Sequence, residues 1–187
     1  MKRYTLFAGV NGAGKTTMYN TVYVNNNREE PRINTDEMVA GLGSWEDNSL
    51  QIKCAREAAL FIRKYFEEGI SFNQETTLTG RSIIKNIIDA KSKGFYVRMN
   101  YIALSSPDVA KGRVRDRVSK GGHGIPDETI ERRYYESLKN LSSVIDICDE
   151  IVIYDNTYEC EELIRFHLGK QTYRKEVIPD WLSVYIN

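Results

Sequence analysis

A glycine-rich segment near the amino terminus has the residue types and the spacing needed to bind the phosphates of a nucleotide. Residues 9–16 read GVNGAGKT and match the pattern G-x-x-x-x-G-K-[ST]. In such a loop, backbone N–H groups turn toward the β-phosphate, the lysine reaches the β- and γ-phosphates, and the hydroxyl ligates Mg²⁺. The predicted nucleotide-binding residues are Gly9, Asn11, Gly12, Ala13, Gly14, Lys15, Thr16 and Thr17. Within this set, Lys15 is the predicted catalytic cation and Thr16 the predicted metal ligand.

Two acidic residues stand where predicted strands end, and both are candidates for contact with a substrate. In open α/β sheets the ligand crevice lies beyond the carboxyl ends of the strands. Asp36 follows a short predicted strand and is placed to accept the proton of an attacking hydroxyl, or else to cap a helix. Glu75, Thr76 and Thr77 end another strand and offer hydrogen bonds to a sugar or ribose hydroxyl, or else cap a loop. We expect a general base at Asp36 and substrate contacts from all four residues.

Basic residues are concentrated in the segment 107–134, which we interpret as a lid. Two predicted helices in it are joined by GGHGIP at 121–126, and its cations are Lys111, Arg113, Arg115, Arg117, Lys120, Arg132 and Arg133. Phosphoryl transfer develops charge on oxygens that arginines neutralise, and a glycine joint lets a lid close over bound ATP. His123 in the joint is either a solvent-exposed residue or a substrate contact. The alternatives for the lid are a solvated basic face and an RNA-binding patch.

Short apolar runs that alternate with amphipathic stretches predict the elements that position these residues. The predicted strands are residues 4–10, 32–34, 70–76, 96–104 and 150–154. The predicted helices are residues 15–23, 49–68, 107–120, 127–145 and one around Ile83–Ile88 that ends near Gly94. A polar turn is expected at 25–31. In the helix 49–68, the predicted core face consists of Ile52, Ala55, Ala59, Ile62 and Phe66.

This order of elements predicts an α/β fold of three layers, with a mostly parallel five-stranded sheet and helices on both faces. A helical lid and a small C-terminal hairpin appendage, at about 157–187, complete the expected architecture. The length of 187 residues fits a single domain over 1–187.

Composition and charge exclude several classes of partner. The chain has 26 Lys and Arg against 26 Asp and Glu, and this zero net charge argues against binding to nucleic acid or to an anionic membrane. No apolar run approaches the roughly 20 residues of a membrane span. The start MKRY leads into a β-like run rather than a signal peptide, so the expected location is cytoplasmic.

A phosphate loop serves several classes of protein, which other motifs distinguish. A GTPase carries an N-K-x-D tetrapeptide, which this sequence lacks. Transporter and helicase ATPases carry an acidic pair at the end of an apolar strand, whereas Asp149 and Glu150 precede theirs. Asp155 ends that strand alone, as a loop contact near the nucleotide or as a plain turn residue. What remains is a small ATP-dependent kinase with a pocket for an acceptor hydroxyl.

The phosphate loop, the segments NTD (34–36) and QET (74–76), and the basic lid with its GGHGIP joint together resemble the small zeta-toxin-like P-loop kinases. The resemblance runs from about Tyr4 to Asn156. It implies that Asp36 is the catalytic base, that Glu75 and the adjacent threonines bind substrate, and that lid arginines stabilise the transition state. Among these arginines we expect Arg117, Arg132 and Arg133 to act. Known members of that family phosphorylate a UDP-activated amino sugar and are usually neutralised by an antitoxin.

The expected function is therefore an ATP- and Mg²⁺-dependent kinase that transfers the γ-phosphoryl group to a small-molecule hydroxyl, with an antitoxin as a partner. Two alternatives come from other classes. One is a nucleotide-binding ATPase or switch regulated by a partner, which would not need Asp36, Glu75 or the lid. The other is an RNA-binding accessory protein, which the zero net charge disfavours.

Overall fold

The computed structural model describes residues 1–22, 30–44 and 47–186, and within these residues seven strands form one sheet in the order β2-β3-β1-β4-β5-β6-β7. The strands are β1 (Arg3–Ala8), β2 (Arg32–Ile33), β3 (Phe72–Thr76), β4 (Tyr96–Ala103), β5 (Glu150–Asp155), β6 (Glu161–His167) and β7 (Lys170–Arg174). The first five pair in parallel, which confirms the predicted parallel sheet. The polar turn expected at 25–31 falls mostly on residues outside the described ranges.

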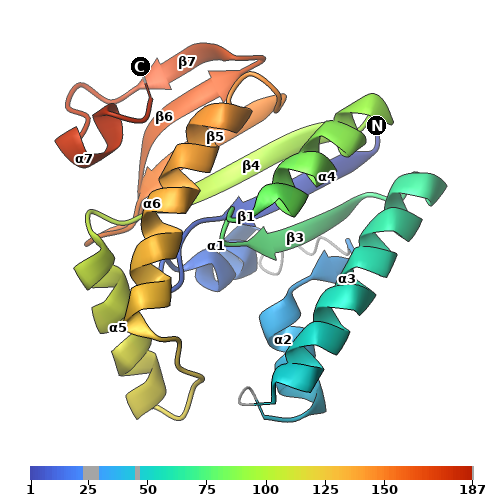
Figure 1. Ribbon diagram of the computed structural model, residues 1–187. Coiled ribbons are helices and arrows are strands. Elements are labelled where there is room, and N and C mark those ends of the chain that lie inside the picture. The colour runs from blue at the N-terminus through green and yellow to red at the C-terminus, as the bar shows by residue number, and fades with distance from the viewer. Residues whose placement is uncertain (23–29, 45–46, 187) are drawn as a thin grey trace.

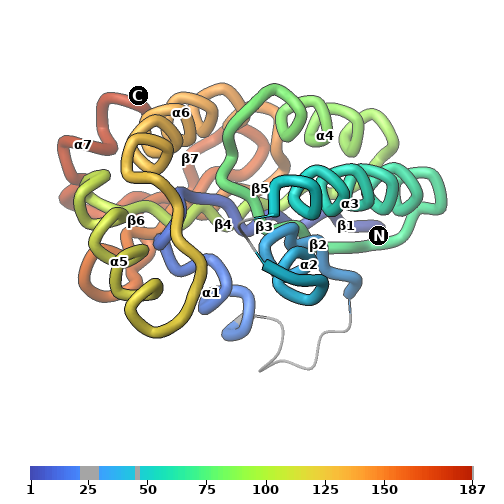
Figure 2. The backbone as a smooth tube through the Cα atoms, turned by 60° about the horizontal axis from the view of Figure 1, so that its bottom comes forward, coloured from blue at the N-terminus to red at the C-terminus, as the bar shows by residue number. Residues whose placement is uncertain are grey.

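Helices cover both faces of this sheet, as expected for a three-layer α/β fold. They are α1 (Lys15–Val22), α2 (Thr35–Leu42), α3 (Asn48–Glu68), α4 (Arg81–Ser92), α5 (Pro107–Ser119), α6 (Asp127–Val144) and α7 (Asp180–Ser183). Helices α3, α4 and α6 lie on one face and α1 on the other (Figures 1 and 2). Ring contacts from β1 mark the two faces, since Tyr4 meets Phe66 of α3 and Phe7 meets Tyr19 of α1.

The prediction of five strands is wrong, because the C-terminal hairpin joins the main sheet instead of forming a separate appendage. Strand β6 pairs antiparallel with β5, and β7 pairs antiparallel with β6. The two-residue turn between them has Leu168 and Gly169 at φ of 50° and 73°, as tight hairpin turns require. Leu163, Ile164 and Phe166 are buried on β6, and this apolar content gives the hairpin a reason to extend the core.

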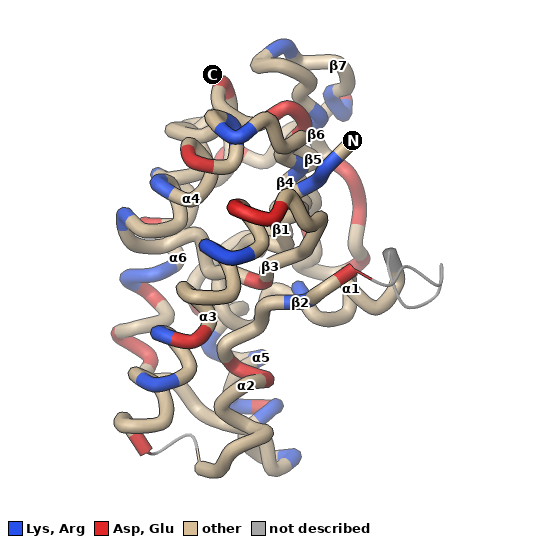
Figure 3. Tube along the Cα trace, turned by 90° about the vertical axis from the view of Figure 1, so that its right-hand side faces the viewer, with Lys and Arg blue, Asp and Glu red and all other residues tan. Residues whose placement is uncertain are grey.

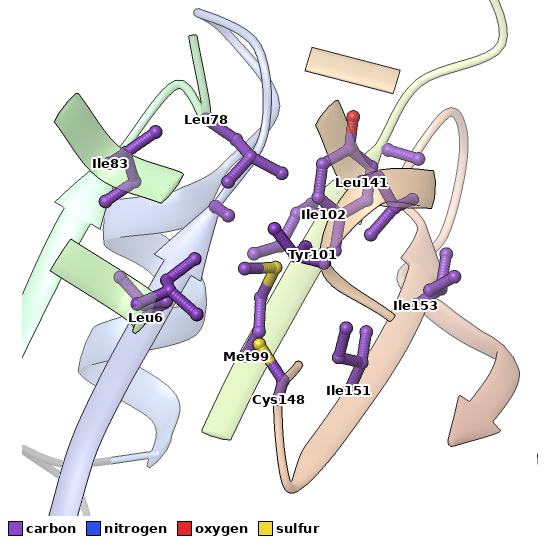
Figure 4. Close-up of a cluster of buried hydrophobic side chains, with 14 of the residues drawn as sticks. Leu6, Leu78, Ile83, Met99, Tyr101, Ile102, Leu141, Cys148, Ile151 and Ile153 are labelled. Carbon is purple, nitrogen blue, oxygen red and sulfur yellow. The ribbon is translucent and has the colours of Figure 1, made fainter. Parts of the chain in front are cut away.

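The main apolar core lies between the central strands and the helices of one face. Figure 4 shows part of this core, in which Met99 and Ile151 from neighbouring strands belong to one cluster with Ile83 of α4 and Leu141 of α6. On α3, however, the predicted core face is wrong in its amino-terminal half. The buried residues are Cys54, Ala58, Ile62 and Phe66, whereas Ile52 is 55% exposed. The α-helical period fits both sets, and packing against the sheet selects the one that includes the small Cys54 and Ala58.

Charged residues of both signs are interspersed along the whole described trace (Figure 3). Several cations of the predicted lid are paired within it, because Lys111 contacts Glu131 and Arg115 contacts Asp127. Among the described residues, none of the helices combines the length and the apolar composition needed to cross a lipid bilayer.

Candidate active site

The phosphate loop connects β1 to α1 and is held by neighbouring backbone. Gly9 has φ of 139°, and a Cβ atom there would lie 2.1 Å from the carbonyl oxygen of Ile102 on β4. The side-chain amide of Asn156 donates a hydrogen bond of 2.8 Å to the carbonyl oxygen of Ala13. Because any side chain at position 9 would collide with main chain, the loop needs glycine where it passes β4.

Lys15 and Thr16 project from the start of α1 into the site. The Lys15 side chain is 7% exposed, and burial lowers the pKa of its amine, while the carboxylates of Glu75 and Asp36 act in the opposite direction. Its Nζ donates to the carbonyl oxygen of Val10 at 3.1 Å. The hydroxyl of Thr16 donates to Glu75 Oε2 at 3.0 Å. Both side chains are therefore directed toward the same carboxylate.

A cavity of about 230 Å³ lies above the phosphate loop. Its lining is Asn11, Gly12, Gly14, Lys15, Thr16, Asp36, Glu75, Arg113 and Arg117. A second cavity of about 170 Å³ is lined by Asn11, Lys15, Asn34, Thr35, Asp36, Gln74, Glu75, Thr76, Thr77 and Arg133. Asn11, Lys15, Asp36 and Glu75 line both, so these four residues stand at the boundary between a phosphate chamber and an adjoining polar chamber. Thr17 is exposed and is not among the residues that line either cavity.

Asp36 lies in the first turn of α2 and does not cap that helix. The cap is Asn34, whose Oδ1 accepts a hydrogen bond of 3.0 Å from the backbone N–H of Asp36. The Asp36 carboxylate is thus free of the capping role that was its alternative interpretation. Its Oδ2 lies 3.5 Å from Nε2 of His123, and about one third of the side chain is exposed.

Glu75 is the centre of a polar network, of which the sequence predicts Glu75 but not its partner Arg32. Its Oε2 accepts hydrogen bonds from Arg32 at 2.8 Å and from Asn34 at 3.2 Å, in addition to the bond from Thr16. Arg32 also makes a two-pronged contact with Glu37. The sequence contains one signal for this role of Arg32, which is a charged residue inside a predicted strand. A guanidinium buried there needs an anionic partner.

The two threonines after Glu75 make local contacts although they line the second cavity. Thr76 Oγ1 accepts a hydrogen bond of 3.0 Å from the backbone N–H of Leu78, which matches the loop-capping alternative. The hydroxyls of Thr77 and Thr79 lie 2.8 Å apart. Asp155 has the turn role that was its simpler interpretation, because its Oδ1 accepts bonds from the backbone N–H and the hydroxyl of Thr157.

The lid arginines divide into those that reach the site and those that do not. Arg117 lines the phosphate chamber and donates to the carbonyl oxygen of His123 from Nε and Nη2, at 3.2 and 2.8 Å. Arg133 donates to Asn11 Oδ1 at 3.0 Å, and burial lowers the pKa of its guanidinium. The structure does not bring Arg132 to this group. Its side chain is 64% exposed and pairs with Glu136 one turn along α6.

Arg113 is another cation of the predicted lid, and its contacts differ from those of Arg117. Its Nη2 donates to the carbonyl oxygens of Asn156 and Thr157, at 2.6 and 3.0 Å, and its Nη1 donates to that of Gly12 at 3.5 Å. Three main-chain acceptors therefore fix this guanidinium, which ties α5 to the phosphate loop and to the end of β5.

His123 faces the site instead of bulk solvent. Its side chain is 17% exposed, and burial, followed by the charge of Arg117, lowers its pKa. With Ala40, Gly43, Ser44, Val118, Gly121, Gly122 and Gly124 it lines an open cavity of about 670 Å³ between α2 and the α5–α6 joint. His123 contacts Asp36, which lines the two smaller cavities.

Solved structures share this fold. AvrRxo1-ORF1, solved in complex with AvrRxo1-ORF2 and with ATP, superposes with a TM-score of 0.74 at 14% identity over 99% of this chain, which spans 62% of the length of that one. The PezAT chromosomal toxin–antitoxin system of Streptococcus pneumoniae gives a TM-score of 0.65 at 18% identity, covering 86% of this chain and 69% of that one. At these identities the likeness shows a common fold.

Sequence comparison identifies the family of this chain as well as its fold. The chain is 30% identical over 128 residues to an uncharacterized protein of Haemophilus influenzae, which is 68% of this chain and 89% of that protein. The model of the Zeta toxin family matches residues 2–162, a range that includes the phosphate loop, both chambers and the lid. Since one family model spans the whole candidate site, the chain belongs to the Zeta toxin family.

Proposed function

We propose that this protein is an ATP-dependent phosphotransferase that moves the γ-phosphoryl group to the hydroxyl of a small molecule. The observation that carries the proposal is the pair of adjoining chambers that share Lys15, Asp36 and Glu75. A kinase needs two ligands to meet at one cation and one base. A nucleotide switch or a simple ATPase needs only the first chamber.

The residues present suit a nucleotide with Mg²⁺. Gly9 and Gly14 let the loop pass where a Cβ would lie 2.1 Å from the carbonyl oxygen of Ile102 and 2.5 Å from the amide nitrogen of Asn156. The N-terminus of α1 directs N–H groups at the phosphates. Mg²⁺ usually takes one or two protein ligands and completes its shell with phosphate oxygens and water. The Thr16 hydroxyl would hold it, and the bound cation would neutralise charge on the β- and γ-phosphates.

In the transfer step, the acceptor oxygen forms a bond to the γ-phosphorus while the bond from that phosphorus to the bridging oxygen of ADP breaks. Asp36 accepts the proton of the acceptor hydroxyl. Lys15, Arg117 and Arg133 stabilise the charge that spreads over the transferring oxygens. Thr77 and His123 contact the acceptor from the polar chamber and the larger cavity.

For the acceptor we propose a UDP-activated amino sugar, and for the cellular role a toxin with an antitoxin partner. Membership of the Zeta toxin family supports the toxin assignment, and the PezAT neighbour is a toxin–antitoxin system by description. The cavity of about 670 Å³ beside Asp36 and His123 supports an acceptor of nucleotide-sugar size.

The test is incubation of the protein with Mg·ATP and a pool of nucleotide sugars, followed by mass spectrometry. The proposed function predicts that one sugar gains the mass of one phosphate, and that Lys15→Ala abolishes this gain. ATP consumption without any phosphorylated acceptor would instead favour the partner-regulated ATPase.

A further inference from the structure

Asp36 and His123 come from distant parts of the chain and meet at the candidate site. Asp36 lies in the first turn of α2, and His123 lies in the joint between α5 and α6, at the same end of the molecule (Figure 1). Nε2 of His123 is 3.5 Å from Oδ2 of Asp36. The ring of His123 is mostly buried, so little water competes for the contact with this carboxylate.

The backbone that carries His123 is fixed against α5. Arg117 donates two hydrogen bonds to the carbonyl oxygen of His123, at 3.2 and 2.8 Å. The backbone N–H of Gly122 donates to the carbonyl oxygen of Arg117 at 3.0 Å. A Cβ at position 122 would lie 2.6 Å from Cγ of Arg117, so the joint passes closer to α5 than a side chain there would allow. These contacts hold His123 toward α2.

The charges around the pair favour a neutral ring. Besides the pair itself, the charged groups that face it come from four elements and are Lys15 of α1, Glu75 of β3, Arg117 of α5 and Arg133 of α6. Burial, followed by the charge of Arg117, lowers the pKa of His123, and the carboxylate of Asp36 acts in the opposite direction. A histidine whose pKa is below its ordinary value of about 6.5 is mostly neutral at pH 7.

The carboxylate determines which nitrogen of the neutral ring carries the proton. A neutral imidazole has one N–H and one lone pair, whereas a carboxylate can only accept. Nε2 of His123 therefore carries the proton where it faces Asp36. A carboxylate held at Oδ2 keeps Oδ1 for the proton of an acceptor hydroxyl, and a base oriented by a third group is a recurring catalytic arrangement. Contacts of this kind are often long in ligand-free sites and shorten when ligands bind.

We propose that His123 is a positioning residue, whose neutral ring holds the carboxylate of Asp36 and whose protonation weakens Asp36 as a base. An imidazolium would add a positive charge beside a carboxylate that already faces Lys15 and Arg133. A carboxylate among more cations takes up a proton less readily. Transfer should therefore decline as the pH falls below about 6.5, where histidines become charged.

This role goes beyond the acceptor contact proposed for His123, because it acts through the base and not through the acceptor. The inference rests on the proposed function, since it takes Asp36 as the base of the transfer.

The first experiment follows the pKa of His123 by NMR and needs neither nucleotide nor acceptor. The chain has two histidines, so the variant His167→Gln assigns the ring signals. In Asp36→Asn we expect the pKa of His123 to fall further, because the carboxylate that raises it is gone. Glu37→Gln is the matched control, since it removes the next carboxylate of α2, which pairs with Arg32, and should leave the pKa of His123 unchanged.

The second experiment measures kcat against pH with Mg·ATP and saturating UDP-N-acetylglucosamine, a UDP-activated amino sugar. At saturation, a residue that only binds the acceptor affects KM and not kcat. We expect His123→Ala to lower kcat at pH 7.5 by roughly 10–100-fold, because Asp36 is no longer held. His123→Gln should recover part of this loss, since its amide can donate to Asp36. Because glutamine does not titrate, the decline of kcat in acid should move to lower pH in this variant.

The outcomes are distinguishable once thermal melting has shown that each variant is folded. An unchanged pKa of His123 in Asp36→Asn would overturn the role of His123 while the kinase proposal stands. A decline of kcat at the same pH in His123→Gln and in the wild type would do the same, as would a raised KM with unchanged kcat in His123→Ala. If the wild-type protein transfers phosphate neither to this sugar nor to the pool, the proposed function itself fails, and the NMR titration still decides whether the two side chains act on each other.

Discussion

The phosphate side and the acceptor side of the active site are held together by different kinds of contact. On the phosphate side, side chains and glycines meet main-chain carbonyls: Asn156 bonds to Ala13, Arg113 bonds to Gly12, and Gly9 lies against Ile102. On the acceptor side, a network of side chains bonded to side chains joins Arg32, Glu37 and Glu75.

This difference has a consequence for how each side can vary. Main-chain contacts depend on the path of the backbone, so few substitutions in the phosphate loop can be tolerated. Such a fixed loop is suited to the triphosphate group, which is the same in every nucleoside triphosphate. Side-chain contacts can be replaced one residue at a time without altering the fold. We therefore expect the choice of acceptor to be set by α2, the end of β3 and the 121–126 joint, while the phosphate loop stays constant.

The largest effect should come from removing the cation that both chambers share. Lys15→Ala deletes the charge that follows the β- and γ-phosphate oxygens, so phosphoryl transfer should fall to the background rate. A radiolabelled transfer assay on the folded variant measures this. Near-normal turnover would contradict the kinase assignment.

Asp36→Asn should separate the two sides of the site. The amide keeps the size of the side chain but cannot accept a proton from the acceptor, so kcat should fall by roughly 10²–10⁴-fold. ADP binding should change little, because the loop is intact. Unchanged kcat in steady-state kinetics would remove Asp36 from the catalytic residues.

The neighbouring arginines of α6 provide a matched pair. Arg133→Ala should lower kcat by roughly 10–100-fold, because its guanidinium bonds to Asn11 and the residue lines the polar chamber. Arg132→Ala should leave kcat within about twofold, since that side chain pairs with Glu136 at the surface. Arg117→Ala should behave like Arg133→Ala. Equal effects of the two α6 variants would show that the lid rearranges when ligands bind.

The smallest effect concerns stability and pH. Burial and the neighbouring Arg117 lower the pKa of His123, with Asp36 acting in the opposite direction. The unfolded chain therefore takes up a proton first, at about pH 6.5, and stability is lost as the pH falls from there toward the lower pKa of the folded state. The drop in Tm between about pH 7.5 and about pH 5.5 should be smaller in His123→Gln than in the wild type, by about one or two degrees. An identical drop would mean that other groups dominate.

The sequence predicted the elements well because their signals are local. The phosphate loop, the apolar run of β4 and the helix cap at Gly69 each depend on residues close in sequence. The core face of α3 was wrong in one half, because Ile52 and Cys54 both fit a helical period and only packing on the sheet decides between them.

The parts of the site that could not be predicted depend on pairing between distant residues. Arg132 and Arg133 are adjacent in sequence, and only the rotation of α6 sends one outward to Glu136 and the other inward to Asn11. Arg32 becomes a partner of Glu75 because β2 lies beside β3, a neighbour relation that no local pattern encodes. The N-cap of α2 is Asn34 and not Asp36. The sequence could not decide between them, since either residue type can cap a helix.

The hairpin that completes the sheet also determines how the described chain can associate with others. A parallel sheet that ended at β5 would expose the apolar strand Glu150–Asp155, an open template for main-chain pairing with another copy. Strand β6 covers it, and β7 then presents an edge on which every residue is exposed, with Lys170 and Arg174 at its two ends. At the opposite edge, β2 is only two residues long. Charged or very short edges resist strand addition and amyloid-like stacking, so protein partners of this chain should dock on its helices and loops.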